Sequence, residues 1–152
     1  MPVVGAFDVG HVRWYVLARR ARALPDPSVI KLVLSGGMVL GPFADPAGID
    51  AYLTQLPDTF AGECMVEPYL VTDGAACDAI VAGALDRGLG VRVGIGDSPD
   101  AFPGASNRAL VERVIDMARA RGLEPATAAE VRSALGLTDR SDVVSGSGRR
   151  ND

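Results

Sequence analysis

The sequence predicts an α/β protein in which four consecutive strand–helix units form a parallel sheet. Two observations predict this class. Short runs of apolar and β-branched residues alternate with longer segments whose apolar residues recur at helical spacing. The strands are apolar throughout, as expected where helices cover one face of a sheet and a core fills the other. Two architectures fit, a small open α/β sheet or half of an eight-stranded βα barrel, and periodicity alone does not separate them.

The first unit and the second strand occupy the N-terminal quarter of the chain. We expect a strand over residues 2–8, where four of the side chains are apolar. A helix is expected from about residue 11 to residue 23, because the Pro-Asp-Pro run at 25–27 cannot continue it. The second strand is expected at residues 29–34, which are apolar apart from one lysine. Right-handed crossovers should join these strands in parallel.

The second helix follows a Gly-rich loop at residues 35–43. Asp45 and Pro46 predict its beginning, because an aspartate caps free backbone N–H groups and proline suits the first helical position. Its apolar side chains recur at the spacing i, i+3, i+4, i+7, which gives the helix one buried face. They are Ile49, Tyr52, Leu53 and Leu56.

The third and fourth units follow the same pattern. Strands are expected at residues 63–67 and 91–95, and helices at about 72–87 and 106–121. The predicted buried face of the third helix consists of Cys77, Ile80, Val81, Ala84 and Leu85. For the fourth helix it consists of Leu110, Val111, Val114, Ile115 and Ala118.

A last short helix is expected to open at Thr127, since Thr127 and Glu130 have the spacing of a capping box. Beyond it, residues 138–152 are polar and rich in glycine and serine, a composition typical of disorder. The predicted organisation is therefore one half-barrel-like α/β domain at 1–137 and a disordered tail at 138–152.

The charge of the chain excludes some classes of partner. With 15 Lys and Arg against 19 Asp and Glu, the net charge is −4, whereas a nucleic-acid site needs clustered cations. The one dense basic run consists of Arg13, Arg19, Arg20 and Arg22, within the first predicted helix and just after it. It fits a solvated helix face better than an anion-binding patch. We expect no nucleic-acid partner.

The two cysteines and the hydropathy of the chain bear on its compartment. Cys64 and Cys77 both fall on apolar faces, which suits buried, reduced thiols better than a disulfide. No apolar run reaches 18 residues, and the N-terminus lacks a basic segment followed by an apolar core. We therefore expect no membrane span and no secretory signal, and a cytoplasmic location.

Candidate chemistry lies at the end of the fourth strand. Side chains alternate across a strand, so if Val91 and Val93 face the helices, Arg92 points into the barrel interior or sheet crevice. A buried arginine needs an anion: a substrate, or a neighbouring carboxylate in a purely structural pair. Asp97 follows in a Gly-Asp-Ser turn at the carboxyl end of the strand, where α/β proteins place their chemistry. Alternatively, Asp97 only forms the turn.

These residues resemble a known family. Residues 91–97, Val-Arg-Val-Gly-Ile-Gly-Asp, are similar to the segment His-Val-Arg-Val-Gly-Leu-Glu-Asp of the β-keto acid cleavage enzymes, typified by 3-keto-5-aminohexanoate cleavage enzyme. Upstream, Phe-Asp-Val-Gly-His at 7–11 resembles the family's Phe-Asp-Thr-Gly-His. Further similarity runs in order through residues 106–107, 110–113, 118–119, 124–127 and 135–137. The similar segments span residues 3 to 137 and match the C-terminal half of the family's chain.

The resemblance implies a (β/α)₈ TIM barrel, of which this chain would form the C-terminal half. Family members bind a divalent metal, usually zinc, and convert a β-keto acid and acetyl-CoA into an acyl-CoA and acetoacetate. By position, Arg92 would correspond to the arginine that acts on developing negative charge. Asp97 would correspond to the family's acid–base aspartate. The implied small-molecule partners are therefore a β-keto acid and acetyl-CoA.

The chain departs from the family pattern at its metal ligands. Gly96 stands where the family has a glutamate ligand, and Gly90 replaces the histidine before the Val-Arg-Val-Gly run. The family's two metal-binding histidines belong to the N-terminal half of the barrel. A catalytic zinc needs three protein ligands, so we expect no metal site of the chain's own. Glu67 at the end of the third strand could in principle replace the missing carboxylate.

His11 is the remaining candidate. It follows the first strand, on the same rim as Asp97, and could contact substrate; the alternative is a histidine that begins a helix and bonds to the local backbone. Because four strands leave two open edges, we expect the chain to pair with another copy or with a separately encoded N-terminal half.

Three functions remain open: a truncated or diverged C–C bond-cleaving acyltransferase, a catalytically silent half-barrel that serves binding or assembly, and a small nucleotide-binding domain. The last is the weakest. Ser35-Gly36-Gly37 is too short for a phosphate loop, and no Gly-x-Gly-x-x-Gly run follows a strand.

Overall fold

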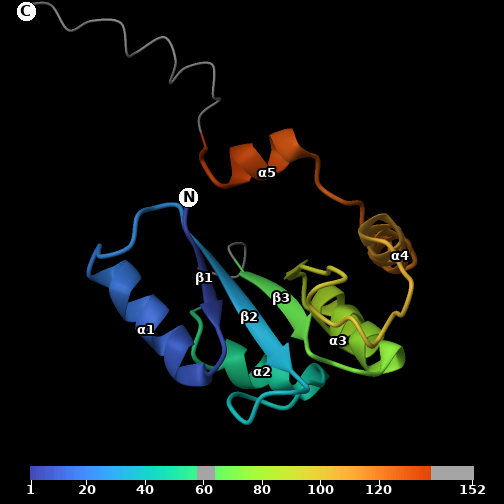
Figure 1. Cartoon of the computed structure of the whole chain (residues 1–152). Helices are drawn as coiled ribbons and strands as arrows, with labels where there is room; N and C mark the ends of the chain where they lie inside the picture. Colours follow the sequence, from blue (N-terminus) through green and yellow to red (C-terminus); the bar gives the residue numbers. More distant parts are fainter. Residues whose placement is uncertain (58–63, 138–152) are drawn as a thin grey trace, which may run out of the picture.

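The computed structural model describes residues 1–57 and 64–137. Its strands are β1 (Val3–Ala6), β2 (Val29–Ser35), β3 (Cys64–Tyr69) and β4 (Gly90–Val91), which form one parallel sheet in that order. Its helices are α1 (Val9–Arg20), α2 (Pro46–Leu53), α3 (Gly74–Asp86), α4 (Asn107–Arg119) and α5 (Ala128–Ala134). The strands alternate with helices along the chain (Figure 1). The structure therefore confirms an α/β fold consistent with half of a βα barrel.

The two faces of the sheet differ. On β2, Ile30, Leu32 and Leu34 are fully buried and belong to the core, whereas Lys31 and Val33 point to the opposite face. The same buried face extends across the sheet, since Leu32 pairs with Ala6 of β1 and with Val66 of β3, and all three belong to the core. The helical side chains that pack on this core are Val12, Tyr15, Val16, Ile49, Tyr52, Cys77, Ile80 and Ala84. The helices thus cover one face and leave the other for polar groups.

Side-chain caps set where the helices begin. Asp45 accepts a hydrogen bond from the Gly48 N–H at 2.8 Å, and Pro46 is the first residue of α2, as the sequence predicted. The predicted capping box between Thr127 and Glu130 is also present, and it holds the pKa of Glu130 below its usual value. The first helix begins two residues earlier than predicted, because Asp8 is its N-cap.

The fourth strand is shorter than predicted. It was expected over residues 91–95, but pairing with β3 stops at Val91, apart from a bond from the Arg92 N–H to the Val66 carbonyl at 2.9 Å. In a parallel ladder the Arg92 carbonyl would next accept a hydrogen bond from residue 68, and that residue is a proline without an N–H. Pro68 therefore frees the chain from the sheet directly after Arg92.

The C-terminal helices are less buried than predicted. Of the five apolar residues expected to be buried on α4, only Leu110 and Ala118 are, and Val111 is 48% exposed. The reason is position, because α4 packs on α3 and only its side toward that helix is covered. Helix α5 has no buried residue. The predicted disordered tail at 138–152 lies outside the described residues.

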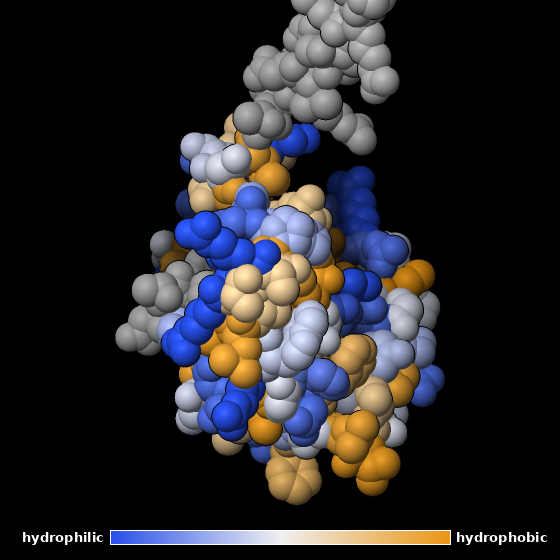
Figure 2. Space-filling model, turned by 90° about the vertical axis from the view of Figure 1, so that its left-hand side faces the viewer, coloured by the Kyte–Doolittle hydropathy of each residue, from blue (hydrophilic) through white to orange (hydrophobic). Residues whose placement is uncertain are grey.

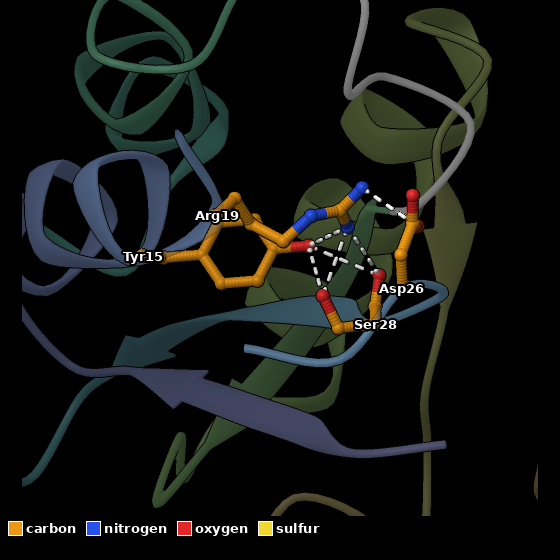
Figure 3. A network of polar contacts seen from close by, with 4 residues as sticks. All are labelled: Tyr15, Arg19, Asp26 and Ser28. Atoms are coloured by element: carbon orange, nitrogen blue, oxygen red, sulfur yellow. Dashed lines mark hydrogen bonds and ion pairs between the residues drawn. The ribbon is translucent and has the colours of Figure 1, made fainter. Parts of the chain in front are cut away.

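The basic run does not form one solvated face. Arg13, Arg20 and Arg22 are exposed, but the Arg19 side chain is only 10% exposed. Its guanidinium donates to the Ser28 hydroxyl at 2.9 Å and to the Tyr15 hydroxyl at 3.2 Å (Figure 3). Tyr15 in turn donates to the Ser28 carbonyl at 3.0 Å. This network ties α1 to the residue that precedes β2, at the amino end of the sheet.

Both cysteines are free and buried. Burial raises the pKa of the Cys64 thiol to about 12 and also raises that of Cys77. Across the part of the chain that the structure describes, no helix is long and apolar enough to cross a membrane.

Replacing Ser28 by alanine should lower the free energy of unfolding by about 1–2 kcal/mol, because Tyr15 and Arg19 lose a buried hydroxyl partner. Urea denaturation measures this. The control is Asp26→Asn, which changes an Arg19 partner that is 77% exposed and should cost less than about 1 kcal/mol. Equal losses in the two variants would contradict a structural role for the buried network.

The buried thiols should resist alkylation by iodoacetamide at pH 8 until the protein unfolds, because the reactive thiolate is disfavoured by burial. Above the ordinary thiol pKa of about 8.5 the unfolded chain releases thiol protons that the folded chain keeps. The free energy of unfolding should therefore fall as pH rises above that value. Mass spectrometry of alkylated Cys64 with and without urea tests the first expectation. Fast labelling of the folded protein would contradict it.

Candidate active site

The face of the sheet opposite the helices carries a buried carboxylate between two cations. Glu67 on β3 has a side chain only 3% exposed. Its Oε2 lies 2.6 Å from Nζ of Lys31 on β2, and its Oε1 lies 2.9 Å from Nε of Arg92. Since Glu67 is on the face opposite the helices, the contact confirms that Arg92 points to that face, as the strand alternation predicted.

Asp97 is the second carboxylate that contacts Arg92. Its Oδ1 lies 3.3 Å from Nη2 of Arg92, and its side chain is 13% exposed. The two residues singled out from the sequence therefore lie in contact at the carboxyl ends of β3 and β4. Both interpretations of Arg92 have support here. Neighbouring carboxylates neutralise it, as in a structural pair, and half of its side chain stays exposed, as binding of a substrate anion requires.

The turn that carries Asp97 is fastened to the end of β3. The Asp97 carbonyl accepts a hydrogen bond from the Leu70 N–H at 2.7 Å. The buried Ser98 hydroxyl accepts from the Val71 N–H at 3.2 Å and donates to the Pro68 carbonyl at 3.3 Å. These bonds replace the strand pairing that Pro68 prevents, and they fix the backbone of Asp97 relative to Arg92.

Two further contacts set the shape of the turn. The Asp97 N–H donates to the Gly94 carbonyl at 3.0 Å, and the first residue of α4, Asn107, accepts the Ile95 N–H on its Oδ1 at 2.9 Å. A Cβ at Gly94 would lie 3.1 Å from Oδ2 of Asp97. Glycine at 94 therefore lets the carboxylate fold back toward Arg92.

The charges in this site balance, but Arg92 keeps spare hydrogen-bond donors. Lys31 and Arg92 contribute two positive charges, and Glu67 and Asp97 two negative ones. A guanidinium has five N–H groups. Because the two contacts of Arg92 use Nε and one donor of Nη2, about three N–H groups stay free on a half-exposed side chain. Arg92 can therefore still bind an external carboxylate by two hydrogen bonds.

His11 does not join this cluster. It lies in the first turn of α1, where its Nδ1 accepts the Phe7 N–H at 3.2 Å, so the local backbone contact expected as the alternative is present. No hydrogen bond or ion pair links it to Arg92 or Asp97 within the described part of the chain. A contact of His11 with substrate remains a prediction.

The donor set does not fit a metal. Among residues 1–57 and 64–137, no three His, Cys, Asp or Glu side chains lie close enough together to hold an ion. Gly96 offers no ligand, although a Cβ there would meet no atom within 4 Å. Glu67, considered as a replacement ligand, has each oxygen bonded to a cation instead.

Sequence reasoning missed Lys31, Ser98 and Leu70. Lys31 carried a signal, since a single lysine within the apolar strand Val-Ile-Lys-Leu-Val-Leu must point to the face opposite the core or find an anion. Ser98 and Leu70 carried none, because their roles depend on hydrogen bonds between segments 27 residues apart.

The sheet topology and the position of the charged residues together define a class of protein. A parallel sheet of βα units in sequential order, with an arginine and carboxylates at the carboxyl ends of its strands, is an α/β fold consistent with half of a βα barrel. The sequence model of the beta-keto acid cleavage enzyme family matches residues 1–137, and the chain belongs to this family. Comparison with curated proteins gives no match.

Replacing Glu67 by glutamine should lower the free energy of unfolding by about 2–3 kcal/mol, because Lys31 loses its buried anion and Arg92 one of its two. Urea denaturation measures the loss. The control is Glu112→Gln, which removes the charge of an exposed ion pair with Arg108 and should cost less than about 0.5 kcal/mol. A Glu67 variant as stable as the control would show that the buried network contributes little.

Proposed function

We propose that this chain carries part of a site that cleaves the C–C bond of a β-keto acid and transfers its acyl group to coenzyme A. The observation that carries the proposal is the contact between Arg92 and Asp97 at the carboxyl ends of the strands, in a member of the beta-keto acid cleavage enzyme family. That contact supplies a cation with free donors and an adjacent carboxylate in one place.

The reaction exchanges acyl groups between two substrates. A β-keto acid, R–CO–CH₂–COO⁻, and acetyl-CoA give R–CO–S-CoA and acetoacetate. The acetyl carbonyl carbon bonds to the CH₂ and releases the CoA thiolate, and the bond between the keto carbon and the CH₂ breaks as that thiolate bonds to the keto carbon. The CH₂ loses one proton when it attacks the thioester and regains one afterwards. A carboxylate placed beside it can accept and return that proton.

The side chains divide these tasks by their charge. Arg92 donates its free N–H groups to the substrate carboxylate and stabilises the negative charge that develops on the carbon framework. Asp97 is the proton acceptor and donor, because it is the carboxylate that contacts Arg92 without being shared with Lys31. Glu67 is a positioning residue, since it holds the guanidinium through Nε.

The metal of the family has no fitting set of ligands among the described residues, so no step is assigned to it. This disagreement favours a second candidate, a half-barrel that binds a β-keto acid without cleaving it. Gly96, which stands where the family's glutamate ligand is expected, is the specific observation behind that alternative.

The test is to incubate the purified protein with acetoacetate homologues and acetyl-CoA, and to measure acyl-CoA formation by chromatography. The variants Arg92→Gln and Asp97→Asn should each lower the rate by about 100-fold or more. The control is Arg113→Gln, which breaks an ion pair with Asp78 between α3 and α4 and should leave the rate within about twofold.

The outcomes separate the two candidates. Acyl-CoA formation that depends on Arg92 and Asp97 supports the acyltransferase. Binding of the keto acid that depends on Arg92, without any acyl-CoA, supports the silent binding module. Failure to bind any β-keto acid would rule out both.

A further inference from the structure

Large hydrophobic side chains are exposed on the loops that follow β2, β3 and β4, and Figure 2 shows hydrophobic groups at the lower end of the molecule, where Figure 1 places the carboxyl ends of the strands. They are Met38, Val39, Leu40, Phe43, Leu70 and Ile95. Their exposed fractions range from 38% for Met38 to 104% for Val39. Leu70 is the member of this set bonded to the proposed site.

Leu70 has a backbone conformation that its side chain disfavours. Its φ is +51°, in the left-handed region where a Cβ approaches the following carbonyl. Yet 38% of its surface is exposed, so burial compensates for the strain only in part. Strained residues of this kind concentrate at functional sites. Here the strain sets the direction of one exposed leucine.

The end of β2 is shaped to receive this leucine. A Cβ at Gly36 would lie 2.9 Å from the Leu70 carbonyl oxygen, and a Cβ at Gly37 would lie 3.0 Å from the Cβ of Leu70. Any side chain at these two positions would displace Leu70. The Gly-Gly pair that is too short for a phosphate loop therefore has a different role, since it lets Leu70 lie directly on the backbone.

Leu70 is also fixed to the turn that carries Asp97. Its N–H donates to the Asp97 carbonyl at 2.7 Å. The residues against which Leu70 lies, Gly36 and Gly37, bear no charge. The partly exposed Leu70 side chain thus presents an apolar surface next to the turn that carries Asp97.

We propose that Leu70, which lies against Gly36 and Gly37, is a specificity-determining residue that packs against the acyl substituent of the β-keto acid, and that this substituent is an alkyl group. The inference rests on the proposed function, because it takes the substrate carboxylate to lie at Arg92. A charged substituent would lose its hydration at this surface without finding a partner.

The test compares three acids of defined chemistry by NMR titration of the ¹⁵N-labelled full chain. Acetoacetate has a methyl substituent, 3-oxohexanoate a propyl group, and 3-oxohexanedioate a chain that ends in a second carboxylate. Two additional buried methylenes, at about fourfold each, should make 3-oxohexanoate bind roughly fifteenfold more tightly than acetoacetate. The diacid should bind more weakly than 3-oxohexanoate.

The variant Leu70→Asn should abolish this preference while leaving the affinity for acetoacetate within about twofold, since asparagine tolerates a positive φ. Leu70→Gly removes the strain altogether and provides a second variant if the first does not fold. The matched control is Arg22→Asn, at the other non-glycine residue of the described chain with a positive φ, 57°, at the C-terminal end of α1. It should keep the wild-type preference.

Equal affinity for acetoacetate and 3-oxohexanoate, or a preference that survives both Leu70 variants, would overturn the role of Leu70. If either of these results is found while acetoacetate binds and Arg92→Gln abolishes that binding, the proposed function stands and only the role of Leu70 fails. Absence of binding by all three acids at millimolar concentration would overturn both.

Discussion

The carboxylate of Glu67 is the group on which the polar side of this protein depends. It is 3% exposed, and a buried charge is tolerated only when cations and hydrogen bonds surround it. Lys31 comes from the neighbouring strand and Arg92 from the residue after β4, so the pairing requires the strand order that the sheet has. The ionic network and the parallel sheet therefore specify each other.

The site exists because the sheet stops early. Pro68 cannot donate to the carbonyl of Arg92, which ends β4 after two residues. The freed chain folds into the turn with Asp97, and Ser98 replaces the missing strand contacts with side-chain hydrogen bonds. A longer β4 would extend the ladder through residues 93–95 and draw the carboxylate away from the guanidinium.

The two ends of the sheet differ in their chemistry. At the amino end, Tyr15, Arg19 and Ser28 form a compact network that fastens α1 to the start of β2. At the carboxyl end, charged groups and exposed hydrophobic side chains lie together, and Leu70 adopts a strained conformation. This division, with stability at one end and reactive groups at the other, is the one expected of βα barrels.

The sequence by itself determined the α/β class, the order of the elements, the caps at Asp45 and Thr127, and the family, because these follow from periodicity and local chemistry. It also indicated that Arg92 faces away from the helices. It did not determine the length of β4 or the extent of burial on α4, since both depend on neighbouring elements. Only the tertiary structure brought Lys31, Glu67, Arg92 and Asp97 together, which lie as far as 66 positions apart along the chain. Ion pairs between strands depend on the register of the strands and on the distance between the buried charged atoms. Neither is encoded in the spacing of residues along one chain.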